Sequence, residues 1–439
     1  MKESVSDYYN RKIVILVSYH KPSVILDTKY LVPIQVGAEN SVYNLKMLKD
    51  NTGDNISDMN ARLCEITAQY WAWKNVKSDY YGFMHYRRHF VFNDISETPD
   101  FGGQIFMKQI DDEYINKIGL VDDKIEKAVI GNDLILTPVI DVSKCFAPNN
   151  EIQFASLNNL HAKDFDLICR ILLDFYPEYY ETVEQYRLGQ NTYWYNMYIM
   201  RKELFFNYCS WLFPILFEAD KQIDYSEYSI QEQRTVAFMA ERLFSIYVKK
   251  LIKDNPDLKI KHLKMTFVEN TEDNSVAQAI ELNNKKKPSY FLQEGLTKAY
   301  KELINLHKVY DIKLEKECYN NTLIRKDGKY EIAFYGAGRS AIKNISLFEM
   351  CFGKKPTIIW DISAEDGDYL ESVPVVKPDF TSDKAKEFIW IITITNPSVS
   401  KSVKEQFLKS GVKSVIEQHE IMPMMVKYTW KEISQGEER

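Results

Sequence analysis

Short apolar runs separated by longer amphipathic stretches characterise the N-terminal part of this chain. The run IVILVS at 13–18 precedes the polar YHKP, a pattern typical of a buried parallel strand that ends in a loop. The runs YYGFMHY at 80–86 and NDLILTPVI at 132–140 predict two further strands. Residues 60–75 have apolar side chains at helical spacings, with Asp58 as a candidate cap. This alternation of strands and helices predicts an α/β fold.

The rest of the N-terminal part is expected to be mostly helical. Segments 151–180 and 203–253 have helical patterns, and the strand-like run WYNMYIM at 194–200 interrupts them. Segment 94–128 is polar and acidic and contains two Asp pairs. We expect it to be a long excursion over the surface.

A change of pattern near residue 275 predicts a second part of the chain. The Lys-rich NNKKKP at 283–288 is expected to be a surface turn, and a charged amphipathic helix follows it. Farther on, the runs EIAFYG, PTIIWDI, IWIITIT and KSVIE alternate with helical stretches, which predicts a parallel α/β domain. We therefore predict a first domain at 1–280, a helical connector at 281–328 and a second domain at 329–439.

Composition and charge narrow the function classes. Hydrophobic residues make up 45% of the chain, which is typical of a folded protein. The net charge of −6 is made of both signs spread along the chain, which argues against a nucleic-acid partner, because phosphate neutralisation needs a basic face. The six cysteines show no CxxC spacing, so neither a zinc site nor a disulfide framework is predicted.

Hydropathy bears on the expected location of the protein. The N-terminus MKESVSDYYNRK has no apolar stretch of signal-peptide length, and no run of about 18 apolar residues occurs. Unpaired cysteines fit a reducing compartment. We expect a cytoplasmic protein, and contact with the inner face of the membrane is an open alternative.

A glycine loop marks the second domain. Gly336-Ala337-Gly338 follows a predicted strand and opens a predicted helix, where glycines permit the turn and phosphate can approach the helix amides. Ala341 occupies the third position of the G-x-G-x-x-G pattern, and Asp361 ends the next strand, where a ribose-binding acid would lie. The pattern predicts a Rossmann-like domain. Either it holds a second nucleotide site at Gly336, Gly338 and Asp361, or the turn serves only its own backbone in an accessory domain.

Several motifs in the first 270 residues occur in a characteristic order. They are VSYHKP, VPIQVGA, CEITAQYWAWKN, YYGFMHYRRHF, NDLILTP, YNMYIMRKELFFNYCSWLFPIL and AERLFSIYV. Together they resemble a family of capsular-polysaccharide and O-antigen glycosyltransferases, some of which transfer galactofuranose from UDP-galactofuranose. The resemblance implies a variant of the GT-A fold, a nucleotide-binding α/β sandwich. It also implies a bacterial enzyme that uses a UDP-sugar and a growing, lipid-linked saccharide acceptor.

The expected donor site departs from the usual GT-A pattern. A typical GT-A enzyme binds a divalent metal with Asp-x-Asp at the end of a central strand, whereas this sequence has His85-Tyr86-Arg87-Arg88 there. Two guanidiniums can bind phosphate oxygens and remain charged, so we assign Arg87 and Arg88 to the leaving diphosphate, with His85 beside them. A surface Arg pair that bridges neighbouring acids is the alternative. No cofactor is predicted.

A divalent metal stays an open question. Acids elsewhere could bind Mn²⁺ or Mg²⁺, and the candidates are Asp133 and the Asp pairs at 111–112 and 122–123.

Other residues complete the predicted donor and acceptor sites. His20 and Lys21 follow the first strand, where open α/β sheets bind ligands, and the resemblance adds Glu65 to the donor side. The acceptor candidates are His161 (with Asp164), Asn191, Trp194, Asn196 and Arg234. For the general base we choose Glu232, at the start of a predicted helix; Glu241, Asp166 and Asp133 are its rivals.

The sequence thus predicts an enzyme that transfers a hexosyl unit. Two other function classes stay open. One is an oxidoreductase or epimerase that binds NAD or a nucleotide sugar at the glycine loop, and the other is an interaction protein without catalysis.

Overall fold

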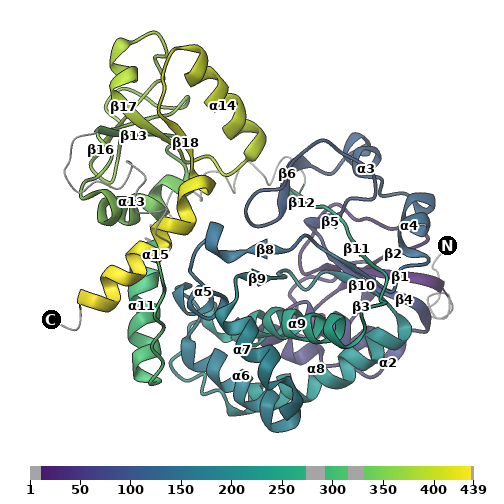
Figure 1. The fold of residues 1–439 in the computed structure, drawn as a ribbon. Helices are drawn as coiled ribbons and strands as arrows, with labels where there is room; N and C mark the ends of the chain where they lie inside the picture. The colour runs from purple at the N-terminus through teal and green to yellow at the C-terminus, as the bar shows by residue number, and fades with distance from the viewer. Residues whose placement is uncertain (1–10, 273–291, 315–330, 437–439) are drawn as a thin grey trace.

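Two sheets rich in parallel strands, each flanked by helices, form the two lobes of the molecule (Figure 1). The computed structural model describes residues 11–272, 292–314 and 331–436. The architecture confirms the α/β fold class predicted from the hydrophobic pattern. The predicted domain boundaries near 280 and 328 lie outside the described residues.

The first sheet has a mainly parallel centre with antiparallel additions. Its main path is β11 (Ile260–His262), β7 (Leu134–Leu136), β10 (Tyr198–Arg201), β4 (Ser78–His85), β1 (Arg11–Tyr19), β2 (Leu31–Gln35) and β3 (Leu48–Lys49). β1 is parallel to both β2 and β4, and β10 is antiparallel to β4. Three more strands extend the sheet from the end of β4: β5 (Arg88–Phe90), β6 (Gln104–Gln109) and β12 (Met265–Asn270). A separate two-stranded ladder joins β8 (Ile140–Asp141) and β9 (Asn191–Thr192).

Alternation along β1 explains why the first sheet has helices on both faces. Val14 and Leu16 belong to the core on one face, while Ile13, Ile15 and Val17 belong to the core on the other. The first core is closed by α2 (Ile66–Asn75), α6 (Ala162–Phe175), α7 (Tyr180–Leu188), α8 (Lys202–Gln222) and α9 (Thr235–Asp254). The second is closed by α3 (Asp112–Ile118) and α4 (Asp122–Val129). Because both faces are covered, β1 reads as a continuous apolar run.

Two local expectations were wrong. Segment 94–128 contains β6, α3 and α4 and is not a long loop. Its acidic pairs belong to helix starts: the Asp111 side chain accepts a hydrogen bond from the Tyr114 amide, and Asp122 opens α4. The expected helix at 60–75 is divided into α1 (Asn60–Leu63) and α2, and Asp58 lies inside the short 3-10 helix η2 (Ser57–Met59).

The second sheet has the strand order of a doubly wound fold. The order is β15 (Tyr369–Leu370), β16 (Val373–Val376), β14 (Ile358–Trp360), β13 (Glu331–Tyr335), β17 (Phe388–Ile392) and β18 (Val415–Glu417). All neighbours are parallel except β15 and β16. The helices of this lobe are α13 (Arg339–Phe352), η6 (Asp383–Glu387), α14 (Pro397–Lys409) and α15 (Gln418–Gly436). The first β-strand lies in the centre, so the chain reverses direction across the sheet at β13 and β17.

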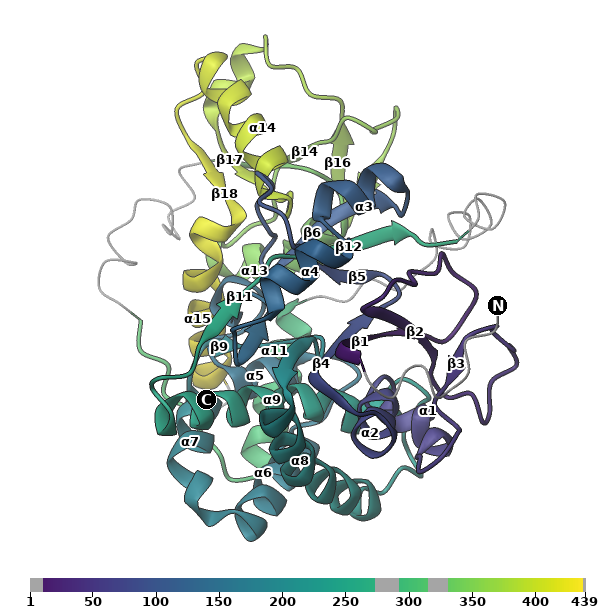
Figure 2. The ribbon, with the colours of Figure 1, turned by 90° about the vertical axis from the view of Figure 1, so that its right-hand side faces the viewer.

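Helix α11 (Leu292–Asn305) joins the two lobes and packs against both. It contacts α5 (Asn150–Ser156) on one side and α13 and α15 on the other, and Figure 1 shows α11 and α15 side by side. One apolar core includes Ile152 of α5, Leu296 of α11 and Met425 of α15. In Figure 2, the sheet and α14 of the second lobe lie above α11 and α5. The remaining short helices are η3 (Val142–Lys144), η4 (Pro177–Tyr179) and η5 (Glu232–Arg234).

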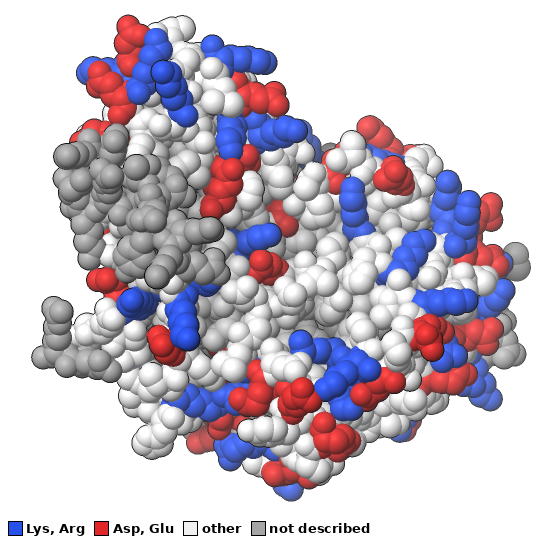
Figure 3. All heavy atoms as spheres, in the orientation of Figure 1, with Lys and Arg blue, Asp and Glu red and all other residues white. Residues whose placement is uncertain are grey.

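The surface has two features that bear on partners. Acidic and basic side chains are interspersed over the face seen in Figure 3. Among the described residues, no helix is both long and apolar enough to cross a bilayer.

Candidate active site

The carboxyl ends of β1 and β4 meet at one edge of the first sheet. Ser18 pairs with His85 in the parallel ladder, so the residues that follow β1 lie beside the end of β4. A tight hairpin then turns the chain back, and His85 pairs with Arg88 of β5. The ring of His20 meets the ring of Tyr86 edge-on, with 5.0 Å between their centres. The fold therefore brings together two motifs that the sequence separates by more than 60 residues.

The break between α1 and α2 places Glu65 at this edge. Cys64 has φ 50° and ψ −130°, a backbone conformation that non-glycine residues rarely adopt. The Asn60 side chain fixes the break by donating to the Cys64 carbonyl at 2.6 Å. Glu65 then caps α2 with helical torsion angles.

A second strained backbone segment binds three side chains of the site. Tyr195 and Asn196 have φ of 77° and 51°, just before β10. His85 Nε2 donates to the Tyr195 carbonyl at 2.6 Å, and the Tyr195 amide donates to Glu241 Oε1 at 2.9 Å. The Asn196 side-chain amide donates to Glu65 Oε1 at 2.8 Å. Strain of this kind persists only where the surroundings hold it, and it clusters at functional sites.

Guanidinium groups surround the two carboxylates. The Arg88 guanidinium lies 4.6 Å from the centre of the Tyr195 ring, and Arg234 Nε donates to Cys64 Sγ at 3.1 Å. Arg242 forms an ion pair of 2.8 Å with Glu241. We call this group the strand-end centre: Glu65, His85, Arg88, Tyr195, Asn196, Arg234 and Glu241.

Burial shifts the titration of the strand-end centre. Burial, with help from Glu65, raises the pKa of Glu241, although Arg242, Arg88 and the Tyr195 amide act in the opposite direction. Burial also lowers the pKa of His85, and Arg88 adds to this effect, whereas Glu65 and the hydrogen bond to Tyr195 act in the opposite direction. His85 is therefore neutral near pH 7, with its proton on the nitrogen that faces the Tyr195 carbonyl.

Arg87 and Arg88 lie against one aromatic ring. Their guanidiniums are 4.6 and 5.1 Å from the centre of the Phe267 ring of β12. Arg87 also donates to the Glu269 carbonyl at 3.0 Å, and Arg88 donates to the Gln104 side chain at 3.3 Å. The fold thus keeps the predicted pair together at the end of β4.

Three buried polar atoms near this edge have no hydrogen-bond partner among the described residues. They are Asn196 Oδ1, Trp194 Nε1 and Arg87 Nε. Buried polar atoms are nearly always paired, so each of these is available to a ligand or to water. The Trp194 ring packs against Phe146 at 6.0 Å between centres, beside Arg242.

The other predicted residues lie in different surroundings. Lys21 forms an ion pair with Glu272, and Asn191 is an exposed residue of β9. His161 bonds to Glu232 at 3.0 Å and to Glu302 of α11 at 3.2 Å. Glu232, which the sequence predicts as the general base, therefore contacts His161 and lies outside the strand-end centre.

The structure also shows the contacts of the other acids considered for the general base. Asp133 binds Arg201 and the Lys259 amide, and Asp166 binds Arg170 and Lys308. Asp164 is buried and accepts hydrogen bonds from Tyr228 and Thr235. Of the rivals, only Glu241 belongs to the strand-end centre. Among the described residues, no group of three or more His, Cys, Asp or Glu side chains is placed to bind a metal ion.

The glycine loop of the second lobe donates a hydrogen bond to Asp361 of the same lobe. Gly336 has φ 104°, and a Cβ there would meet Thr393 Oγ1 and Ile394 Cγ1 at 3.1 Å, so any other residue would be strained at this position. Gly338 caps α13, and the Ala337 amide donates to Asp361 Oδ2 at 2.7 Å. The other Asp361 oxygen accepts from the Ser363 amide at 2.9 Å. Asp361 thus already occupies one loop amide that a phosphate would use, and the second nucleotide site stays a prediction.

Sequence reasoning missed the strained segments. Cys64, Tyr195 and Asn196 carry no glycine signal, although Asn tolerates positive φ better than most residues. Glu241 was only one of several acids on a helical pattern. Its place follows from the packing of α9, which the sequence alone does not reveal.

Comparison with known proteins now adds to this geometry. A family profile described as a domain of unknown function, DUF4422, matches residues 14–254, which is more than half of the chain. The chain belongs to this family. Every residue of the strand-end centre lies within the matched DUF4422 region.

A solved structure is similar to most of this DUF4422 protein. It is the apo structure of WbbM, described as a bifunctional glycosyltransferase, with 26% sequence identity and a TM-score of 0.57. The similarity covers 87% of this chain and 66% of WbbM, so the chain spans about two thirds of WbbM's length. A comparison with proteins that have curated descriptions found no match.

Proposed function

We propose that this DUF4422 protein is a glycosyltransferase that moves a hexosyl unit from a UDP-sugar to a growing saccharide. Galactofuranose is our first candidate for the unit, and a lipid-linked surface polysaccharide is our first candidate for the acceptor. The similarity to a bifunctional glycosyltransferase over 87% of the chain supports the reaction class. The sequence resemblance described above supports the donor and the acceptor.

The observation that carries the proposal is the strand-end centre. Two carboxylates and several guanidiniums meet a neutral histidine at the carboxyl ends of parallel strands, where open α/β sheets bind ligands. Such an arrangement suits glycosyl transfer, which needs positive charge for the leaving diphosphate and a base for the acceptor hydroxyl. Arg87 and Arg88 would bind the diphosphate, beside His20 and Lys21.

Glu65 is our candidate for the base. One of its oxygens accepts from Asn196, and no described residue donates to the other. In contrast, each Glu241 oxygen has a donor, the Tyr195 amide and Arg242. We therefore assign proton abstraction to Glu65, while Glu241 holds the Tyr195 segment. The acceptor would lie near Trp194, whose indole can stack on a sugar, and near Asn196 Oδ1, to which no described residue donates.

Ligand binding by the full chain provides the test. UDP should give heat in isothermal titration and raise the melting temperature, because a ligand that binds only the native state stabilises it. UDP-galactofuranose, UDP-galactose and UDP-glucose should then be compared by release of UDP with a saccharide acceptor. Absence of both heat and a melting shift at millimolar UDP would rule out the proposal.

A further inference from the structure

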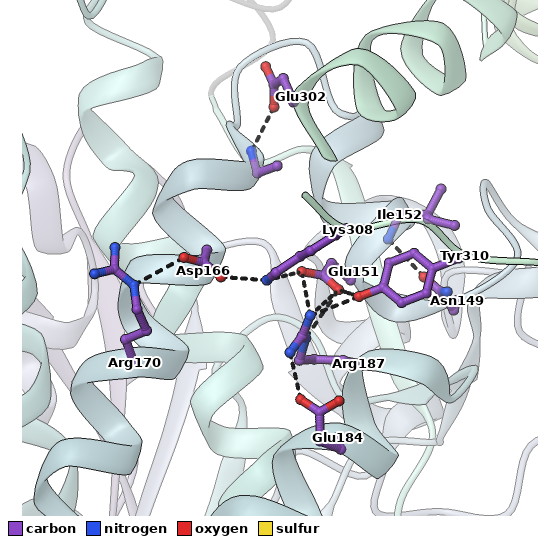
Figure 4. A network of polar contacts seen from close by, with 11 residues as sticks. Asn149, Glu151, Ile152, Asp166, Arg170, Glu184, Arg187, Glu302, Lys308 and Tyr310 are labelled. Atoms are coloured by element: carbon purple, nitrogen blue, oxygen red, sulfur yellow. Dashed lines mark hydrogen bonds and ion pairs between the residues drawn. The ribbon is translucent and has the colours of Figure 1, made fainter. Parts of the chain in front are cut away.

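Helix α11 supplies caps to two helices of the first lobe. Glu302 Oε2 accepts a hydrogen bond of 2.6 Å from the Ala162 amide at the start of α6, which Figure 4 shows. One turn earlier, Lys298 Nζ donates to the carbonyls of Ala155 and Leu157 at the end of α5, at 3.1 and 3.2 Å. Helix ends leave such groups without intrahelical partners. The connector therefore completes two helix ends that the first lobe leaves open.

The same glutamate belongs to a charged bridge. His161 Nδ1 faces Glu302 Oε1 at 3.2 Å, and His161 Nε2 faces Glu232 Oε1 at 3.0 Å. Ionised carboxylates only accept hydrogen bonds, so both ring nitrogens must carry protons and the ring must be positive. We call His161, Glu232 and Glu302 the His161 bridge.

Several charged groups act on the His161 bridge. The hydrogen bond to Glu302 raises the pKa of His161, and Glu232 adds to it, whereas burial and Lys298 of α11 act in the opposite direction. The Tyr228 ring lies 5.1 Å from the imidazole, Lys163 of α6 lies over that ring, and the Asp164 carboxylate is nearby on α6. The carboxylates on two sides therefore favour the charged ring.

From the bridge, the chain leads directly to the strand-end centre. Glu232 opens η5, and Glu232 Oε2 accepts from the Ser229 amide at 2.8 Å. Two residues later, Arg234 contacts Cys64 at the strained break beside Glu65. The carboxylates of Glu65 and Glu241 both raise the pKa of Arg234. Anchoring η5 at its first residue therefore fixes where its last residue points.

We propose that Glu302 and His161 are positioning residues, through which the connector helix α11 orders η5 and places Arg234 beside Glu65. The catalytic part of this inference rests on the proposed glycosyl transfer, whereas the ordering of η5 does not. The first sheet's site is then incomplete without a helix that lies outside the region matched by DUF4422.

The structure offers a matched control in a second anchor of the same connector. Lys308 and Tyr310 bind the buried Glu151 together with Arg187, and this network has no contact with η5 among the described residues (Figure 4). Tyr310→Phe should therefore weaken docking of the connector without disturbing Arg234. Glu302→Gln and His161→Gln should do both.

The experiment combines hydrogen–deuterium exchange with kinetics on full-length variants. In Glu302→Gln and His161→Gln, peptides over 229–236 should exchange faster than in wild type, and kcat/KM should fall by up to about 100-fold, the loss that a misplacement of about 1 Å can cause. Tyr310→Phe should leave both unchanged. His161→Gln should add no further loss to Arg234→Ala, because both changes act through one side chain.

The pH profile adds a readout that a merely structural role would not move. Because the folded-state pKa of His161 is raised, the bridge is complete below about pH 6.5, the ordinary histidine value, and is lost as pH rises through the folded pKa. The alkaline fall of wild-type activity should therefore be absent from His161→Gln.

Two results would overturn the inference. One is unchanged exchange at 229–236 in both bridge variants, and the other is faster exchange there with wild-type kcat/KM. If wild-type protein transfers no sugar, the proposed function fails, and exchange at 229–236 still decides whether α11 orders η5.

Discussion

The strand-end centre and the glycine loop both lie at the carboxyl ends of parallel strands in their sheets, but their polar groups are used differently. At the end of β4, buried atoms such as Asn196 Oδ1 and Arg87 Nε have no partner among the described residues, and the backbone at Tyr195 is strained. At the end of β13, Asp361 accepts from the loop's own Ala337 amide, and the buried atoms without a partner among the described residues of that lobe, Asn344 Oδ1 and Ser346 Oγ, lie farther along α13. The comparison teaches that topology marks where a ligand could bind, whereas unsatisfied polar groups and strain mark where one is expected.

The largest effect should come from Glu65. Glu65→Gln should lower kcat by about 10²–10⁴, the usual contribution of general acid–base catalysis, while the fold is retained. Glu232→Gln is the matched control, because Glu232 belongs to the His161 bridge, and its loss should be about 100-fold or less. Steady-state release of UDP measures both. A larger loss in Glu232→Gln would favour Glu232, the base that the sequence predicts.

Arg88 should rank next. Arg88→Ala should reduce kcat/KM by about 100-fold, because removing one charge-stabilising donor typically costs about 2.7–4 kcal/mol of barrier. Arg88→Lys should recover little, since an ammonium lacks the planar fork. Kinetics close to wild type in both variants would mean that the pair is a surface feature.

Glu241 predicts opposite effects of pH on activity and stability. Its raised pKa means that activity should fall, as pH drops, at a higher pH than the ordinary glutamate value of about 4.3. By linkage, the stability from this group is full below the unfolded pKa and declines as pH rises through the folded one. Glu241→Gln should shift the acid limb of the pH–rate profile to lower pH. An unmoved limb would assign it to another group.

The glycine loop should respond in stability alone. Asp361→Ala removes acceptors from the Ala337 and Ser363 amides, so the free energy of unfolding should fall by about 1–2 kcal/mol. Transfer kinetics should stay at the wild-type value, as thermal melts and UDP release would record in parallel. A strong loss of kcat with little change in melting would make this loop a functional nucleotide site.

The smallest effect should be that of chelation. Two guanidiniums at the end of β4 would supply positive charge where a typical GT-A enzyme uses a metal, so activity should survive excess EDTA with little loss. The assay compares UDP release with and without chelator, then with manganese restored. Activity that disappears and returns with manganese would refute the arginine mechanism without touching the glycosyltransferase proposal.

The sequence predicted those features that depend on local pattern. The apolar runs located β1, β4, β13 and β17, and Arg87-Arg88 follows β4 as the sequence predicts. The acidic pairs at 111–112 and 122–123 led to the wrong prediction of a long surface loop, because acids also occur at helix starts. The break at Cys64 could not be predicted, since neither glycine nor proline marks it and one of its contacts comes from Arg234, far away in the chain.

Choosing among the acids lay beyond the sequence for a different reason. Glu232 and Glu241 are nine positions apart, and each has an arginine within the next two positions of the sequence. Only the packing of α9 on the first sheet decides that Glu241 reaches the Tyr195 amide, while Glu232 turns toward His161. Such choices depend on contacts more than 40 residues apart in the chain, which periodicity does not encode.

The caps that α11 lends to α5 and α6 have a consequence for protein engineering. Chimeras that exchange the C-terminal lobe for another module should retain residues 292–310 with the N-terminal partner, because Lys298, Glu302 and Tyr310 satisfy groups there. A fusion joined before residue 292 would discard these three side chains together. The fusion point for such a chimera should therefore lie after α11, and not at residue 254, where the DUF4422 match ends.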